Sequence, residues 1–152
     1  FDGDAMLSFY GILPRMISPR RSATAACQTA LEMLQAINAL NELREARGEP
    51  PLITGIGVHT GVVTAGGLGS SDRMHYTIIG DTVNTTQRLE SLTRQLFNGS
   101  AILVSQATLD ALGDAKDSFQ FQELGSFTVR GKSERVTVFH LPTQIPPDEI
   151  DK

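Results

Sequence analysis

Apolar residues recur along this chain with two different periods, which predict helices in some stretches and strands in others. The longest helical pattern begins at Ser22, which we interpret as the N-cap, and ends before Gly48; its apolar positions are Leu31, Leu34, Ile37, Leu40 and Leu43. A second helix is predicted after the turn Gly80-Asp81, with apolar residues at Val83, Leu89, Leu92 and Leu96. A third, short helix is predicted from Ser105, as its N-cap, to Leu112.

Short runs rich in β-branched and aromatic residues predict strands over 6–10, 52–58, 61–65, 75–79, 101–104, 119–129 and 136–141. We interpret the second and third runs as a hairpin joined by His59-Thr60 and followed by a glycine-rich loop at Gly66, Gly67 and Gly69. A basic turn, Arg130-Gly131-Lys132, joins the last two strands. Strands interleaved with helices predict a mixed sheet covered by helices, with antiparallel pairs at the hairpins.

Length and charge narrow the class of protein. The 152 residues, 40% of them hydrophobic, fit one domain over residues 1–141, followed by a flexible acidic tail over 142–152. A net charge of −4 and the lack of a basic stripe argue against a nucleic-acid partner. One cysteine, Cys27, excludes an internal disulfide framework, and no apolar run reaches the roughly 18 residues of a membrane span. We therefore expect a cytoplasmic domain.

Two charged motifs suggest ligand chemistry, and each has a simpler alternative. Asp2 and Asp4 alternate, so in an extended chain both carboxylates lie on one face, where they could bind a hard cation or simply form a solvated turn. The turn containing Arg130 and Lys132 resembles the end of a P-loop, but Ser126 stands where the first glycine is required. These two cations could instead clamp a polyphosphate, or lie free in solvent.

Asn84 and Arg88 are four residues apart on the second predicted helix and follow a strand-to-helix turn. They share a helical face, so they could present an amide and a guanidinium to one ligand, or form a solvated polar pair. We expect the isolated His59, His75 and His140 to be structural. Cys27 lies inside the longest helix, where a buried small side chain is the expected role.

Four segments together resemble the catalytic domain of class III nucleotidyl cyclases, in order and in spacing. They are residues 1–11, 55–66, 76–88 and 129–132. The resemblance covers residues 1–141 and is closest to bacterial adenylate cyclases whose catalytic domain follows a sensor and a membrane anchor. It implies an α+β fold with a ferredoxin-like mixed sheet and packed helices.

The resemblance also implies roles for individual residues. Asp4 matches the second of two aspartates that bind two Mg²⁺ ions, for which Mn²⁺ can substitute. Asn84 and Arg88 match the pair that orients the ribose and stabilises the transition state, and Thr77 matches the residue that reads the purine. Arg130 falls at the position of a phosphate-binding lysine, with Lys132 as a second candidate.

The implied activity is the conversion of ATP to cyclic AMP and pyrophosphate by two-metal phosphoryl transfer. In the family, the site lies at a homodimer interface, with the aspartates from one subunit and the Asn/Arg pair from the other. The first metal aspartate and a purine-reading lysine are expected upstream of Phe1, so we expect the chain to be inactive alone and the parent protein to carry an upstream sensor or membrane domain. A guanylate cyclase, or a catalytically silent cyclase-like module that binds nucleotide or a partner, remains an alternative.

Overall fold

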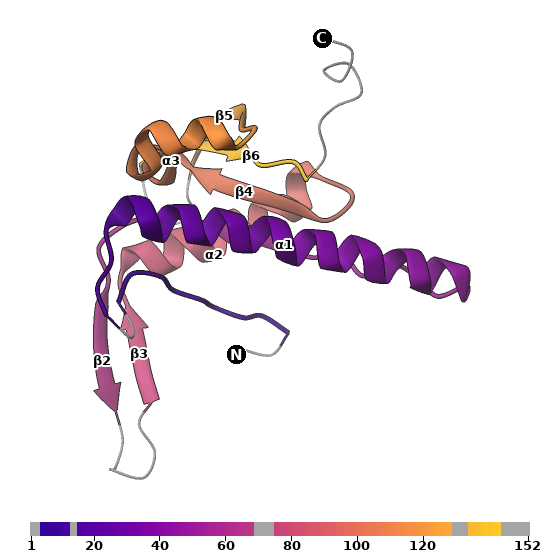
Figure 1. Cartoon of the computed structure of the whole chain (residues 1–152), viewed down its shortest axis with the longest axis horizontal. Helices are drawn as coiled ribbons and strands as arrows, with labels where there is room; N and C mark the ends of the chain where they lie inside the picture. Colours follow the sequence, from indigo (N-terminus) through magenta and orange to yellow (C-terminus); the bar gives the residue numbers. More distant parts are fainter. Residues whose placement is uncertain (1–3, 13–14, 69–74, 129–133, 144–152) are drawn as a thin grey trace.

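The computed structural model describes residues 4–12, 15–68, 75–128 and 134–143 (Figure 1). Along the described chain the elements are α1 (Pro19–Ala46), β1 (Gly55–Val58), β2 (Thr64–Leu68), β3 (His75–Ile79), α2 (Asp81–Leu96), β4 (Ala101–Ser105), α3 (Gln106–Leu112), the 3-10 helix η1 (Gly113–Ser118), β5 (Gln122–Thr128) and β6 (Arg135–His140). Most of the acidic tail predicted over 142–152 lies outside the described residues.

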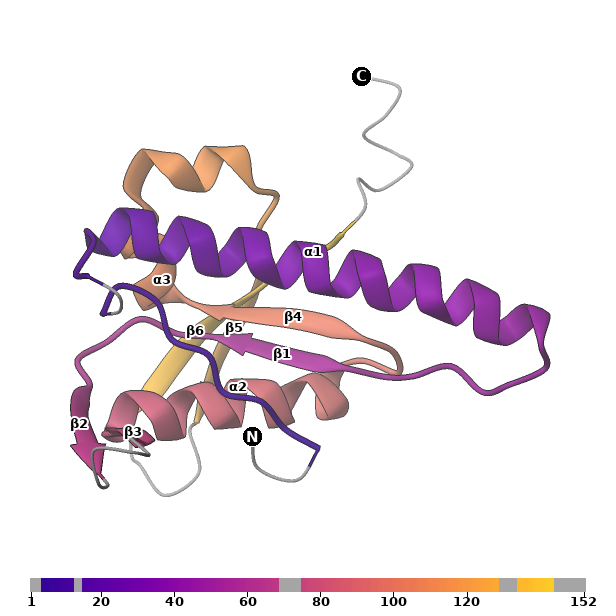
Figure 2. The same ribbon diagram turned by 60° about the horizontal axis from the view of Figure 1, so that its bottom comes forward.

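The main sheet has the strand order β1-β4-β6-β5, with β1 parallel to β4 and the other neighbours antiparallel. Helix α1 lies on one face of this sheet and α2 on the other (Figure 2). Side chains alternate along β4 accordingly: Ile102 and Val104 join the cluster that includes α1, whereas Leu103 packs with Leu89 of α2 and Val138 of β6. The predicted mixed sheet with packed helices is confirmed, although the described strands form two sheets rather than one.

Helix α1 begins four residues before its predicted start. Ser18, not Ser22, is the N-cap, and its hydroxyl accepts a hydrogen bond from the Arg21 amide at 3.2 Å. Pro19 follows at the first helical position, where its fixed φ suits a helix and its missing N–H is not needed. Although α1 has 28 residues, no helix in the described part of the chain is long and apolar enough to cross a membrane.

The core-facing side of α1 is formed by small residues. Ala23, Cys27, Ala30 and Leu34 are buried at helical spacing. Burial raises the pKa of the Cys27 thiol to about 12, so the thiol is neutral at physiological pH and its predicted role as a buried small side chain is confirmed. The carboxyl-terminal half of α1 projects beyond the sheet (Figure 2), which explains why Leu43, predicted as a core position, is 61% exposed.

The predicted hairpin of residues 52–58 and 61–65 is wrong. Strand β1 pairs in parallel with β4 in the main sheet, whereas β2 pairs with β3 in a separate antiparallel ribbon that extends away from it (Figure 1). Gly66 and Gly67, predicted as a loop, lie within β2. Strand propensity indicates which residues are extended, but it does not determine which strand they pair with. Here the pairing is determined by contacts between residues distant in sequence.

The strand predicted over residues 6–10 is also wrong. This segment carries no strand or helix, and its apolar side chains, including Met6 and Phe9, are exposed. An extended segment becomes a strand only by hydrogen bonding to a neighbouring strand, and neither of the two described sheets includes this one. The remaining strand predictions correspond to β3, β4, β5 and β6.

We expect the stability of the fold to decrease below about pH 6.5 because of His140. The ring of His140 lies 4.5 Å from that of Phe97, and partial burial lowers its pKa. Below the unfolded-state pKa of His140, the folded state then binds fewer protons than the unfolded state. The contribution of His140 to the free energy of unfolding is therefore fully present above the unfolded-state pKa, and it is lost as the pH falls from there toward the folded-state pKa. Urea unfolding between pH 7.5 and 5 should show a smaller loss for His140→Gln than for the native protein. Parallel curves for the two proteins would refute the assignment to His140.

Candidate functional site

A tight turn between β3 and α2 positions the first candidate residues. Gly80 occupies the N-cap of α2 with φ of 147°, a conformation that L side chains rarely adopt. The Thr82 hydroxyl, in the first turn of α2, donates a hydrogen bond of 2.7 Å to the carbonyl oxygen of Val62. The predicted order of strand, turn and helix is confirmed here, and the turn fixes where the first residues of α2 lie.

Two glycines of β1 allow α2 to lie directly on the sheet. A Cβ at Gly57 would be 2.6 Å from the Glu90 nitrogen and 2.6 Å from the Thr86 oxygen, both backbone atoms of α2. A Cβ at Gly55 would overlap the Thr93 hydroxyl. Since residues 55 and 57 lie on one face of the strand, this face has no side chains between the two backbones, and α2 has little freedom to shift.

Asn84 and Arg88 lie one turn apart on α2, as their spacing predicts. Asn84 is exposed, whereas Arg88 is partly buried. The Nη1 atom of Arg88 is buried and has no hydrogen-bond partner among the described residues. A buried donor without a partner costs about 1–3 kcal/mol, and more when it is charged. Nη1 is thus a buried donor that the described part of the fold leaves without a partner.

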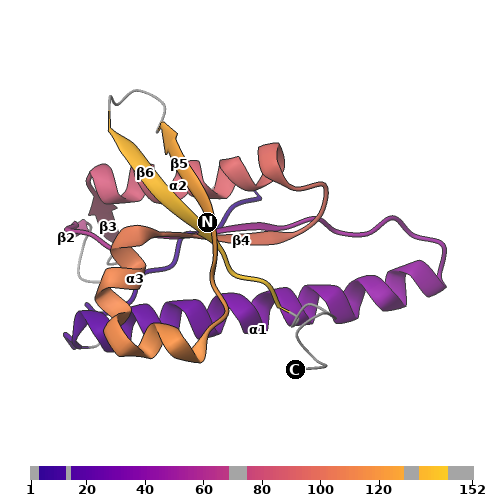
Figure 3. The same ribbon diagram turned by 90° about the horizontal axis from the view of Figure 1, so that it is seen from above.

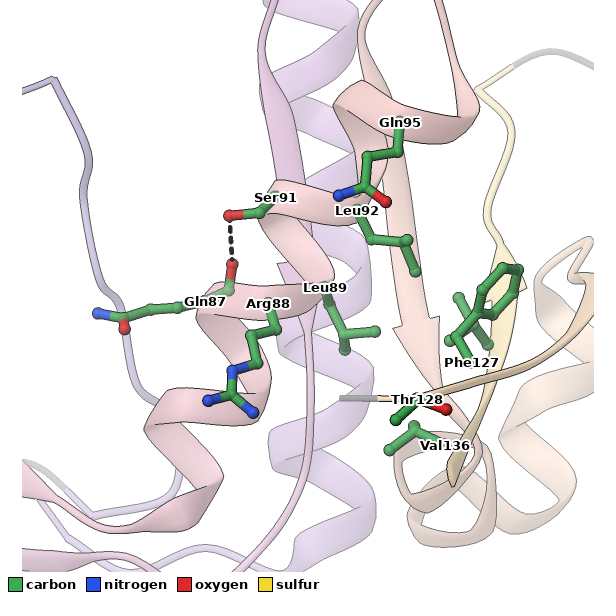
Figure 4. A pocket seen from close by; sticks show the side chains of 10 residues that line it. Gln87, Arg88, Leu89, Ser91, Leu92, Gln95, Phe127, Thr128 and Val136 are labelled. Atoms are coloured by element: carbon green, nitrogen blue, oxygen red, sulfur yellow. Dashed lines mark hydrogen bonds between the residues drawn. The ribbon is translucent and has the colours of Figure 1, made fainter. Parts of the chain in front are cut away.

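Arg88 lines a pocket of about 390 Å³ between α2 and the β5–β6 hairpin. Leu89 and Leu92 project from α2 toward Phe127 and Val136 of the hairpin (Figure 4) and form an apolar wall. Seen from above, strands β5 and β6 lie beside α2, and α1 lies on the opposite side (Figure 3). A pocket of this volume suits a small organic ligand, with the cation of Arg88 in its wall.

Polar groups line the rest of the pocket. They are Gln87, Ser91 and Gln95 from α2, and Thr128 from the end of β5. The Ser91 hydroxyl is used within the helix, since it donates to the Gln87 carbonyl at 3.1 Å (Figure 4). The arrangement offers an apolar surface for a ring, amides that can donate or accept, and a guanidinium for an anion.

For three further candidate binding residues from the sequence, the structure describes at most the backbone. Thr77 lies in β3, where its backbone is paired with Gly66, but its side chain lies outside the described residues. Arg130 and Lys132 also lie outside them, in the connection between β5 and β6. Thr128, the last residue of β5, lines the pocket, so the chain enters this basic connection directly from the pocket wall.

Asp4, the candidate metal ligand, lies in the amino-terminal segment, outside the helices and strands. It lies in an exposed turn, and no hydrogen bond or ion pair joins it to α2 among the described residues. The described part of the chain also contains no group of three or more His, Cys, Asp or Glu side chains that could bind a metal ion. Asp4 supplies one carboxylate, and a two-metal centre requires several oxygen ligands, so the other ligands would have to come from outside the described residues.

The sequence did not single out the other residues that line the pocket. Ser91 and Gln95 follow Arg88 at helical spacing, so the face containing Arg88 could have been extended toward them. Phe127 and Val136, in contrast, were treated only as strand residues. Nothing in the local pattern indicates that the hairpin turns these side chains toward α2.

With this arrangement established, comparison with known proteins identifies the family. A profile described as the adenylate and guanylate cyclase catalytic domain matches residues 3–142. The chain belongs to this family. Among solved structures, this cyclase domain is similar to the adenylyl cyclase CyaB from P. aeruginosa, with 28% identity and a TM-score of 0.72 over 90% of this chain and 66% of that one. The predicted family and the predicted α+β, ferredoxin-like fold are both confirmed.

The cyclase domain is also similar to an adenylate cyclase, to a peptide receptor and to a guanylyl cyclase. It is 30% identical over 93% of its length to adenylate cyclase 1 of Rhizobium meliloti, and 37% identical over 95% to atrial natriuretic peptide receptor 2 of Mus musculus. Among structures, the guanylyl cyclase Cya2 is 30% identical, with a TM-score of 0.67 over 85% of this chain and 61% of that one. The chain spans 20% of the Rhizobium protein and 13% of the mouse receptor.

Proposed function

We propose that this domain catalyses the conversion of ATP to cyclic AMP and pyrophosphate. The observation that carries the proposal is the Arg88 guanidinium in the pocket wall, with a buried nitrogen that has no partner among the described residues. Negative charge builds up on the phosphate oxygens around the reacting phosphorus as the reaction proceeds. A guanidinium without another partner is suited to stabilise this charge. Family membership and the relatives named adenylate cyclase support the same activity.

The reaction needs positioning and charge stabilisation more than covalent chemistry from the protein. The ribose 3′-hydroxyl gives its proton to solvent and attacks the α-phosphorus, and a new P–O bond closes the ring. The bond between the α-phosphorus and the oxygen that bridges to the β-phosphate breaks, and that oxygen leaves with pyrophosphate. Arg88 stabilises the charge on the transferring phosphoryl group, and Asn84, one turn earlier, orients the ribose. Thr77 contacts the purine, and Arg130 with Lys132 binds the outer phosphates.

We extend the proposal to a Mg²⁺-dependent homodimer, in which Asp4 of one copy and Arg88 of the other serve the same nucleotide. The family resemblance implies a shared site, and among the described residues no ion pair joins Asp4 to α2 within one chain. Asp4 would supply one oxygen ligand for the cation. Titration of Mn²⁺ into the native protein and into Asp4→Ala, followed by electron paramagnetic resonance, tests this ligand without relying on turnover.

The full-length protein, given ATP and GTP together with Mg²⁺, should release mainly cyclic AMP, measured by mass spectrometry. Predominant cyclic GMP would instead establish a guanylate cyclase, the alternative favoured by the similarity to Cya2. A folded protein that binds nucleotide but forms neither product would support a catalytically silent module. Sedimentation of the same sample, with and without nucleotide, shows whether a dimer forms.

A further inference from the structure

The loop that follows β1 is hydrogen-bonded at both of its ends to elements distant in sequence. We refer to residues 59–63 as the strap. At its start, His59 Nδ1 lies 2.7 Å from the Ser105 hydroxyl, and the Thr60 hydroxyl lies 2.9 Å from that of Thr108. At its far end, the Val62 carbonyl accepts the bond from Thr82. The strap therefore connects the end of β4 and the first turn of α3 to the first turn of α2.

The first attachment is buried and is fully formed by side chains. Ser105 and Thr108 are both 0% exposed, and their hydroxyls lie 3.4 Å apart, so the two bonds to the strap form one continuous network. Ser105 occupies the predicted N-cap position of α3, but its hydroxyl makes no capping bond and is directed to His59 instead. Buried polar groups that are mutually satisfied define one local geometry, because breaking any bond leaves an unpaired group.

The second attachment fixes the helix that carries the proposed catalytic pair. The Thr82 side chain packs against Gly61, where a Cβ would overlap its hydroxyl. Asn84 follows two residues later in the same turn. The position of Thr82 relative to the Val62 carbonyl therefore affects where Asn84 lies, and a misplacement of about 1 Å in a positioned group can reduce turnover 100-fold.

We propose that the strap is a positioning device, in which Thr82 is a positioning residue for Asn84 and Thr108 anchors the opposite end. The catalytic consequence depends on the proposed function, whereas the mechanical coupling between α3 and the first turn of α2 does not. None of the four hydroxyl and imidazole groups of the network has to contact the nucleotide for this role.

Amide hydrogen exchange tests the coupling in a way that does not require activity. Thr108→Val removes the buried hydroxyl, and exchange over residues 83–86, which include the first hydrogen-bonded amides of α2, should become at least threefold faster although these residues are distant in sequence. Thr93→Val is the matched control, because Thr93 is 1% exposed and the hydrogen bond that its hydroxyl makes among the described residues stays within α2, to the Glu90 carbonyl at 2.6 Å. Unchanged exchange over 83–86 in Thr108→Val, or an equal increase in the control, would overturn the proposal.

Kinetics of the full-length protein test the catalytic consequence. Thr82→Val should lower kcat about tenfold with KM changed less than twofold, because the substitution misplaces Asn84 without removing a group that binds the substrate. Thr82→Ser, which retains the hydroxyl, should restore kcat to within twofold of the native value. Loss of kcat in both variants to the same extent would contradict the role of this bond. A native protein without turnover would refute the proposed function. The amide hydrogen exchange experiment would still decide whether the strap couples α3 to the first turn of α2.

Discussion

Replacing Arg88 with Met should lower cyclic nucleotide production by roughly 10²–10³-fold while leaving the fold as stable as before, or more stable. The loss is the typical effect of removing one preorganised donor that stabilises developing charge. Stability should not fall, because the buried Nη1 of Arg88 has no partner in the described structure, and Met retains the length and apolar contacts of the side chain. Turnover of the full-length variant and its midpoint of thermal unfolding are the two measurements.

Arg94→Met provides the matched control on the same helix. Its side chain is 64% exposed and pairs with Glu90 at 2.6 Å, an i,i+4 surface pair whose loss typically costs about 0.3–0.5 kcal/mol. We expect its turnover to stay within twofold of the native value. If Arg88→Met retained full activity, or lost activity only in proportion to a loss of stability, the guanidinium would have no part in the reaction.

The sequence predicted those parts of the fold that depend on local pattern. Helix α2 and its turn were identified because Gly80 and the apolar spacing after it are local signals. The pairing of β1 was not, since β1 hydrogen-bonds to β4, whose residues lie more than 40 positions later. Residues 6–10 have strand propensity but belong to neither described sheet, so propensity alone predicted a strand where the structure has none.

In the candidate site, too, the sequence predicted local relations between residues but not the contacts between distant segments. Asn84 and Arg88 could be placed together because a helix relates positions four residues apart. The apolar wall formed by Phe127 and Val136 could not, since it depends on how the hairpin stands against α2. That Asp4 and Arg88 serve one nucleotide is implied only by the family resemblance, in which two subunits share one site.

Gly57→Ala should destabilise this domain strongly for a change of a single methyl group. The new Cβ would lie 2.6 Å from two backbone atoms of α2 and 2.9 Å from the Leu89 Cβ, and neither backbone atom can rotate away. Overpacking of this kind costs about 1–3 kcal/mol and sometimes more. Urea unfolding monitored by circular dichroism should show that loss, as a lower midpoint with an unchanged slope.

Gly99→Ala separates this steric effect from the general effect of replacing glycine. No heavy atom lies within 4 Å of a Cβ at Gly99, and its φ is not positive, so its free energy of unfolding should stay within about 0.5 kcal/mol of the native value. Because the clash in Gly57→Ala forces α2 away from β1, the folded fraction of that variant should also lose turnover through Asn84 and Arg88. Native stability in Gly57→Ala would show that α2 can move on the sheet, and the rigid placement of the catalytic pair would then be wrong.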